Sequence, residues 1–398
     1  MASTLTALSA FAGVGFGVAC ERMGIIELGV ENDMDVLAMR HAAGMITIAH
    51  DVWSLADPSI ELEYDLLLAG PPCQTFSKVG RGHGRGYLDT LVDIILGTKQ
   101  HSLAALHSEI YGLFTAPELD SRTALVLMPL LYALRDRPKA IVLEQVPDVL
   151  PIWEAYAEVL RAHGYSAVTA VVAAEQYGVP QTRRRAVLIA NRDRQVVMPA
   201  PTHSRYHVRS PSRMDPGVKP WLSMADAMGW PEGVVGFPRL ADGRDEGVEI
   251  NDREYRSRDL RPTDRPAWGV TGKARSWKRW GFTARPATVV TGHGIATRHP
   301  SGTQRTHLNA IEDGSFELRE PWTVSSARLP TYDNVSLSRS YAGDAVNITP
   351  EEGAVLQTFD PSFPFVGTKT KVWQTLGNAI PPRLAQHLIG AVLGTELT

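Results

Sequence analysis

Residues 1–192 alternate between short apolar runs and longer helical patterns, and this alternation restricts the fold more than any other feature of the chain. Seven apolar runs have the length of strands: Thr4–Ala10, Gly24–Glu31, Met45–Ala49, Tyr64–Gly70, Ala140–Val146, Ala167–Ala173 and Ala186–Ala190. Helical patterns lie between several of them, for example at 125–134 and 152–163. Since strands that alternate with helices form mostly parallel sheets covered on both faces, the pattern predicts an α/β fold with a doubly wound sheet.

The character of the chain changes between residues 195 and 345. This segment is rich in Pro, Gly, Arg and Trp, and it carries 21 Lys and Arg against 17 Asp and Glu, although the whole chain has a net charge of −3. A regular pattern returns near Asn347, and a helical pattern follows Pro381-Pro382. We therefore expect a first domain at 1–194, a smaller loop- and strand-rich domain at 195–345, and a segment at 346–398 that returns to the first domain.

Several classes of protein are excluded by composition. No run of 18 uncharged apolar residues predicts a membrane span, and the apolar stretch 5–20 lacks the basic region of a signal peptide. Two cysteines are too few for a disulfide framework or a four-cysteine zinc site. We expect a cytoplasmic protein with no metal and no membrane partner.

A glycine turn follows the first predicted strand, in Phe11-Ala-Gly13-Val14-Gly15-Phe-Gly17. Such a turn between strand and helix brings backbone N–H groups close to a ligand. Glu31 closes the second predicted strand, where a carboxylate can accept hydrogen bonds from ribose, and Asp51 follows the third. The turn has no lysine of the kind that binds nucleotide triphosphates. The pattern indicates a dinucleotide or S-adenosylmethionine (SAM).

Cys73 follows the fourth predicted strand, in Gly70-Pro-Pro-Cys73-Gln74. The prolines stiffen the turn and place the cysteine at the carboxyl edge of the sheet, where α/β proteins bind ligands. An isolated cysteine is more often a buried structural thiol. A cysteine in a stiff turn at this edge favours a nucleophile.

These two motifs resemble those of the DNA (cytosine-5)-methyltransferase family. The proline–cysteine motif of the family matches Pro72-Cys73-Gln74, and its first motif matches 11–15. Its further motifs follow in family order at Glu144-Gln145-Val146, at Gln181, Arg183 and Arg185, at 348–360, and at 377–382. The middle segment occupies the place of the variable target-recognition domain. The resemblance implies the Rossmann-like fold of a SAM-dependent methyltransferase.

The resemblance also implies a mechanism. The target cytosine flips out of duplex DNA, Cys73 attacks C6, and Glu144 assists at N3. Arg183 and Arg185 stabilise charge at the ring and bind a flanking phosphate. The methyl group of SAM passes to C5, which gives 5-methylcytosine and S-adenosylhomocysteine.

By the same resemblance, the cofactor lies against ten residues. Phe11 stacks near the adenine, Glu31 binds the ribose, Asp51 binds the adenine amine, and Asn378 holds the methionine end. The whole expected set is Phe11, Gly13, Val14, Gly15, Glu31, Asp51, Val52, Pro72, Asn378 and Ala379.

Contacts to DNA are expected from basic segments. Arg81 and Arg85 lie in a glycine-rich loop after the nucleophile, and the segment 253–285 carries ten basic residues against three acidic ones. The candidate DNA contacts are Arg81, Arg85, Gln181, Arg275, Lys278 and Arg279. We expect a monomeric bacterial or phage-type protein that is associated with the nucleoid, with a cognate restriction endonuclease as a candidate partner.

The chain departs from the family pattern at four places, one of which is Thr123, where a glycine often follows Arg122. Phe16 replaces a glycine and is expected to crowd the cofactor turn, and Gln145 replaces an asparagine. The stretch 87–120 is long and predicts two short helices, which form either a packing insertion or an extra binding surface. Two other functions stay open: methylation of cytosine in RNA such as tRNA, and a catalytically silent DNA-binding subunit.

Overall fold

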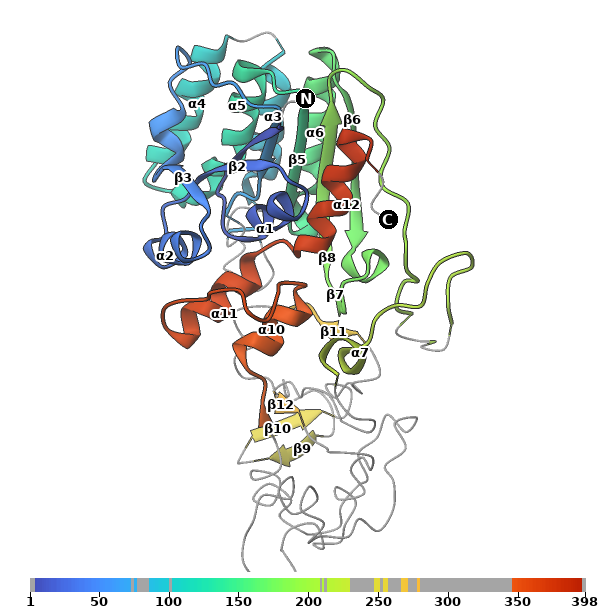
Figure 1. Cartoon of the computed structure of the whole chain (residues 1–398). Helices are drawn as coiled ribbons and strands as arrows, with labels where there is room; N and C mark the ends of the chain where they lie inside the picture. The colour runs from blue at the N-terminus through green and yellow to red at the C-terminus, as the bar shows by residue number, and fades with distance from the viewer. Residues whose placement is uncertain are drawn as a thin grey trace, which may run out of the picture.

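The computed structural model describes residues 4–72, 75–76, 86–99, 102–207, 210, 213–229, 247–250, 253–256, 266–270, 278–279 and 346–395. Within these residues the chain forms a seven-stranded sheet with helices on both faces (Figure 1). This confirms the predicted α/β fold with a mostly parallel, doubly wound sheet.

The strand order in the sheet is β3-β2-β1-β4-β5-β8-β6. The strands are β1 (Thr6–Ala10), β2 (Ile26–Val30), β3 (Ile46–Ala49), β4 (Leu66–Ala69), β5 (Ala140–Gln145), β6 (Ser166–Ala173) and β8 (Arg184–Asn191). Each lies within or overlaps one of the seven apolar runs. Strand β8 runs antiparallel to β5 and β6. The other four pairs of neighbouring strands in the sheet are parallel.

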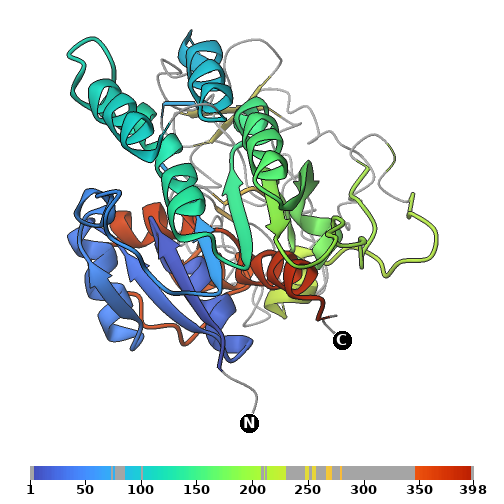
Figure 2. The same cartoon turned by 90° about the horizontal axis from the view of Figure 1, so that it is seen from above.

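Alternate residues of the strands enter two hydrophobic cores, because successive side chains of a strand point to opposite faces. One face packs against α3 (Leu88–Gly97), α4 (Leu103–Thr115), α5 (Met128–Asp136) and α6 (Leu150–Ala162). The other packs against α1 (Gly15–Arg22) and α12 (Pro382–Leu393). The view from above separates these two layers of helices (Figure 2). The near-continuous apolar strands are thus explained by burial on both faces.

The C-terminal segment returns to the sheet through α10 (Pro350–Leu356), α11 (Lys369–Asn378) and α12. A third core joins α10 and α11 to the start of α1 and to α2 (Met34–Ala42), and it includes Met224 of α7 (Met224–Met228) and Val270. Phe16 is buried in the core under α12, together with Ile380 and Leu384. Its ring therefore contributes to the packing between α1 and α12.

Three short strand pairings accompany the main sheet in the described residues. Strand β7 (Gln181–Thr182) pairs with β11 (Ala267–Trp268), β12 (Lys278–Arg279) pairs with β13 (Val346–Asn347), and β9 (Gly247–Ile250) pairs with β10 (Arg253–Arg256). Three-residue to seven-residue 3-10 turns complete the elements: η1 (Val52–Leu55), η3 (Ser121–Leu127), η4 (Pro147–Val149) and η5 (Ala174–Tyr177). The division at 194 and 345 stays a prediction.

The long stretch before residue 120 forms the two helices that its pattern predicts. Leu91 and Ile95 of α3 and Leu106 and Ile110 of α4 are buried in the first core. Four aromatic rings gather at its border, where Trp53 contacts His107, Tyr111 and Phe114. These contacts support the interpretation of a packing insertion.

Strand order determines where a ligand can bind. The chain runs outward from β1 to β3 and returns to β4 on the other side of β1, so the connections leave β1 and β4 in opposite directions. In doubly wound sheets, a crevice forms at the carboxyl edge at this point. Most of the expected cofactor and catalytic residues lie at or just after the carboxyl ends of β1, β2, β3, β4 and β5, at that edge.

Candidate functional site

The glycine turn after β1 has the backbone conformation that its residues predict. Gly13 has φ +52°, in the left-handed region that glycine adopts at little cost. Phe11 has φ +55°, which for an aromatic residue costs on the order of 1–3 kcal/mol and is typical of functional sites. An added Cβ at Gly13 would meet no atom within 4 Å. The turn therefore leaves open space next to its backbone.

Glu31 lies directly against this turn. Its Oε2 accepts a hydrogen bond from the Gly13 N–H at 2.9 Å, and its Oε1 accepts from the N–H groups of Asn32 and Asp33. A carboxylate oxygen can accept two hydrogen bonds, and Oε2 accepts one here, so Glu31 retains capacity for a hydroxyl donor. The carboxylate and the open turn fit the ribose and methionine ends of SAM.

The third strand leads into η1, where Asp51 accepts a hydrogen bond from the Trp53 N–H at 3.0 Å. Asp51 is exposed and Val52 is buried. The Val52 carbonyl accepts a hydrogen bond from the buried Tyr132 hydroxyl, and Arg135 donates to the Asp57 carbonyl. Helix α5 therefore holds this loop in place beside the crevice.

The C-terminal segment lies directly against the glycine turn. An added Cβ at Gly15 would lie 2.3 Å from the Ile380 carbonyl oxygen, so only glycine allows this approach. Asn378, the last residue of α11, is exposed, and the following Ala379 is buried. The two ends of the chain, which are far apart in sequence, thus meet at the expected cofactor site.

Substitution of Gly15 by alanine is expected to separate these two segments. The neighbour is a backbone carbonyl, which cannot rotate away, so overpacking should lower the free energy of unfolding by about 1–3 kcal/mol and weaken SAM binding. Chemical denaturation and calorimetry with SAM measure both effects. Gly112→Ala is the control, because Gly112 lies within α4, has no positive φ, and an added Cβ there would meet no atom within 4 Å. Equal SAM affinity of the two variants would contradict this role of Gly15.

Glu144 and Arg185 come together at the same edge. The Glu144 carboxylate, on β5, forms an ion pair with Arg185 of β8, with Oε1 2.6 Å from Nε. The side chains are 7% and 16% exposed. Because β8 runs antiparallel to β5, its first residues lie where β5 ends. This pairs a carboxylate with a cation in a largely dry environment, in which charge interactions are stronger than in water.

The turn that leads to Cys73 lies against this pair. An added Cβ at Gly70 would be 3.7 Å from Glu144 Oε2. The buried Gln145 donates from Nε2 to the Pro71 carbonyl at 2.5 Å. Gln145, which replaces the asparagine of the family motif, thus holds this turn against β5. Cys73 itself lies outside the described residues, and Pro72, which precedes it, is half-buried.

Arg183 is buried and contacts three backbone carbonyls. Its guanidinium donates to Val270, Gly377 and Ala379 at 2.9–3.0 Å. Two of these carbonyls flank Asn378. Arg183 therefore connects the strand that carries Arg185 to the segment expected to hold the cofactor.

Gln181 has a different position from the one expected. It is 0% exposed, its Nε2 donates to the Leu356 carbonyl and to Gln357 Oε1, and its Oε1 accepts from the Val270 N–H. A fully buried amide with both ends engaged has no group to offer DNA. The structure thus favours a structural role for Gln181 over the predicted DNA contact.

The remaining candidate DNA contacts cannot be placed as side chains. Arg81, Arg85 and Arg275 lie outside the described residues. The backbone of Lys278 and Arg279 forms β12, which pairs with β13 next to the returning C-terminal segment. These contacts stay predictions.

One important residue was missed by the sequence analysis. Arg40 of α2 is fully buried and donates to the Gly13 carbonyl at 2.9 Å. Its ion-pair partner is Glu27, at 2.7 Å. The available signal was Glu27 inside an apolar strand, which requires a buried cation nearby.

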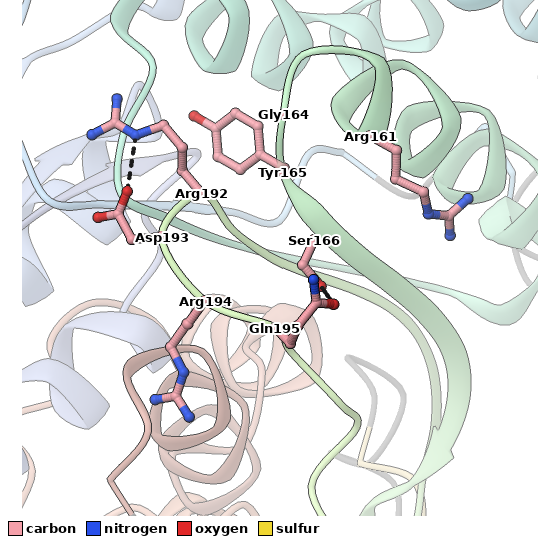
Figure 3. A pocket seen from close by; sticks show the side chains of 8 residues that line it. All are labelled: Arg161, Gly164, Tyr165, Ser166, Arg192, Asp193, Arg194 and Gln195. Atoms are coloured by element: carbon pink, nitrogen blue, oxygen red, sulfur yellow. Dashed lines mark hydrogen bonds and ion pairs between the residues drawn. The ribbon is translucent and has the colours of Figure 1, made fainter.

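A pocket of about 460 Å³ lies away from these residues (Figure 3). It is formed where β8 ends and β6 begins, which is the opposite edge of the sheet because Asn191 pairs with Ala140 at the start of β5. Its lining is Arg161, Gly164, Tyr165, Ser166, Arg192, Asp193, Arg194 and Gln195. Arg161 donates to the Ala167 carbonyl, and Arg192 donates to the Arg137 carbonyl. The pocket is therefore separate from the candidate site.

In the part of the chain that the structure describes, no group of three or more His, Cys, Asp and Glu side chains could hold a metal ion. None of the described helices is long and apolar enough to cross a membrane.

Comparison with known proteins gives consistent matches. A model of the C-5 cytosine-specific DNA methylase family matches residues 5–101 and 120–394, and the unmatched residues between them contain α4. M.OihORF3336P of Oceanobacillus iheyensis is 24% identical over an alignment of 418 positions. The alignment covers 89% of this chain and 84% of that protein. The type II methyltransferase M1.HphI of Haemophilus parahaemolyticus is 23% identical over an alignment of 405 positions. The alignment covers 98% of this chain and 87% of that protein.

A solved structure shows the likeness in fold. The S. pombe Dnmt2 methyltransferase covers 98% of this chain and 99% of its own, with a TM-score of 0.51 and 14% sequence identity.

Proposed function

The chain belongs to the C-5 cytosine-specific DNA methylase family, and we propose that it is a SAM-dependent methyltransferase acting on cytosine C5 in duplex DNA. The observation that carries this proposal is the Glu144–Arg185 ion pair beside the turn that leads to Cys73. The family description and the type II methyltransferase M1.HphI support DNA as the substrate, as does the basic segment 253–285. A restriction endonuclease that recognises the same site is the partner that this proposal implies.

Cytosine C5 is a poor nucleophile until C6 carries an added group. We assign this addition to Cys73: a bond forms between its Sγ and C6, and the electrons of the C5=C6 bond move toward N3. Glu144 then shares or donates a proton at N3, where negative charge develops. Because the base is inaccessible within the duplex, the target cytosine must first flip out of the stack.

Arg185 supplies positive charge at this point. Its guanidinium orients the Glu144 carboxylate through the 2.6 Å contact, and its remaining N–H groups can bind the ring oxygen O2. C5 then takes up the electrophilic methyl group that bound SAM would supply, and the proton at N3 returns to Glu144. Loss of the C5 proton to a base and departure of the Cys73 thiolate then restore the C5=C6 double bond.

Arg183 and Gln181 act as positioning residues in this proposal. Arg183 holds the carbonyls on both sides of Asn378, and Gln181 joins β7 to α10 and to Val270. Hydrogen bonds in the low-dielectric interior are stronger than in water, so these contacts help to keep the catalytic edge and the C-terminal segment in a constant arrangement.

Incubation of the purified protein with tritiated SAM and unmethylated genomic duplex DNA is expected to label the DNA, and tRNA should stay unlabelled. Genomic DNA offers many sequences, so a recognition site of unknown sequence is represented. Bisulfite sequencing of the product then identifies the modified cytosine. Label in tRNA alone would move the substrate to RNA. Binding of SAM and DNA with no transfer to either nucleic acid would indicate a catalytically silent subunit.

A further inference from the structure

A buried guanidinium lies under the glycine turn. The Arg40 side chain is 0% exposed and its five N–H groups correspond to five hydrogen bonds. The acceptors are Glu27 Oε1 and Oε2, Thr47 Oγ1, and the carbonyls of Gly13 and Ile46. A fully satisfied planar fork of this kind is rigid, and its bonds extend in several fixed directions.

The sequence of β2 makes room for this group. Glu27 and Gly29 alternate along β2 and therefore share one face. An added Cβ at Gly29 would lie 1.9 Å from an Arg40 nitrogen, so the guanidinium occupies the space above Gly29. Burial raises the pKa of the Glu27 carboxyl, and the adjacent Arg40 opposes this shift. Arg40 is thus the counter-charge that allows a carboxylate at this depth.

Gly13 is held from both sides by charged groups on neighbouring elements. Its N–H donates to Glu31 Oε2 and its carbonyl accepts from Arg40 Nη1, both at 2.9 Å. The peptide unit is planar, so a fixed Gly13 carbonyl also fixes the Val14 N–H, which points to the opposite side. Without these contacts, a glycine at φ +52° could adopt several conformations.

We infer that Arg40, with Glu27 as its counter-charge, is a positioning residue that sets the conformation of the Gly13 turn and thereby the affinity for SAM. The inference rests on the proposed use of SAM by this turn. Arg40 is buried beneath the turn and acts through the Gly13 carbonyl. Its removal should therefore weaken cofactor binding more than it slows the chemical step.

The test uses the full-length protein and two variants. In Arg40→Met with Glu27→Gln, both charges are lost together, so no unpaired buried charge remains to unfold the protein. Arg40→Lys keeps the charge beside Glu27 but has three N–H donors in place of five. We expect the SAM dissociation constant and the KM for SAM to rise about tenfold or more in the double variant, with kcat at saturating SAM within about threefold of wild type. Arg40→Lys should give a smaller rise of the same kind.

Asn191→Ala is the matched control. Asn191 is fully buried, donates to the Val392 carbonyl, and lies at the opposite edge of the sheet. Its replacement should lower the unfolding midpoint but leave SAM affinity unchanged. SAM affinity within about twofold of wild type in Arg40→Lys and in the folded double variant would overturn the inference. If the double variant does not fold, Arg40→Lys decides alone. Failure of the wild-type protein to bind SAM would instead contradict the proposed function.

Discussion

Cys73→Ser is expected to abolish methyl transfer to DNA and to leave SAM binding intact. A serine hydroxyl is a far weaker nucleophile than a thiolate, so kcat should fall by more than about 10³-fold. The cofactor contacts assigned here lie on other residues, so the SAM dissociation constant should stay unchanged. Transfer of tritium from SAM to duplex DNA and calorimetric titration with SAM measure the two quantities.

The chain offers a matched control at its other cysteine. Cys20 of α1 is fully buried, and burial raises its pKa, so it stays a neutral thiol. Cys20→Ala should therefore keep kcat near the wild-type value. Transfer that survives in Cys73→Ser, or that is lost in both variants alike, would contradict the assignment of Cys73 as the nucleophile.

Glu144→Gln is expected to have the second-largest effect. The amide has nearly the same shape as the carboxyl group but cannot donate or take up a proton at N3, so kcat should fall by about 10²–10⁴-fold. The KM for SAM should change little, because Glu144 is not one of the expected cofactor residues. Steady-state kinetics at saturating SAM and DNA measure the change. Glu154→Gln, on the exposed side of α6, is the control.

Arg185→Gln tests whether the ion pair acts as a unit. If Arg185 works by orienting Glu144, the variant that combines Arg185→Gln with Glu144→Gln should lose much less activity than the product of the two single-variant losses in kcat. If the two single-variant losses in kcat multiply in the double variant, Arg185 and Glu144 act independently. Full activity of Glu144→Gln would remove the proton-transfer role from the proposed mechanism.

The fold could be predicted well because its determinants are local. Each strand of the central sheet is a short apolar run, and burial on both faces requires such runs. The edge at which the site lies also follows from sequence, since residues after parallel strands meet at one edge. This reasoning predicts that Gly13, Glu31, Asp51 and Glu144 lie at one edge of the sheet. There Glu31 accepts a hydrogen bond from the Gly13 N–H.

Other features depend on partners that are distant in sequence. Gln181 matched a motif, yet its amide is buried against Gln357 and Val270. Arg183 and Arg185 are two residues apart, but one contacts carbonyls of the C-terminal segment and the other contacts Glu144. No local pattern distinguishes these roles, because they depend on how segments that are far apart in the sequence pack together.

Residue types and their spacing were sufficient for the sheet, the order of its motifs and the family resemblance, since each reflects hydrophobic period or turn chemistry within a short window. Packing of distant segments placed Arg40 under Gly13, the Ile380 carbonyl against Gly15, and Arg185 on Glu144. A buried charge is stable only where folding brings its partners together, and such partners are set by three-dimensional proximity rather than by sequence spacing.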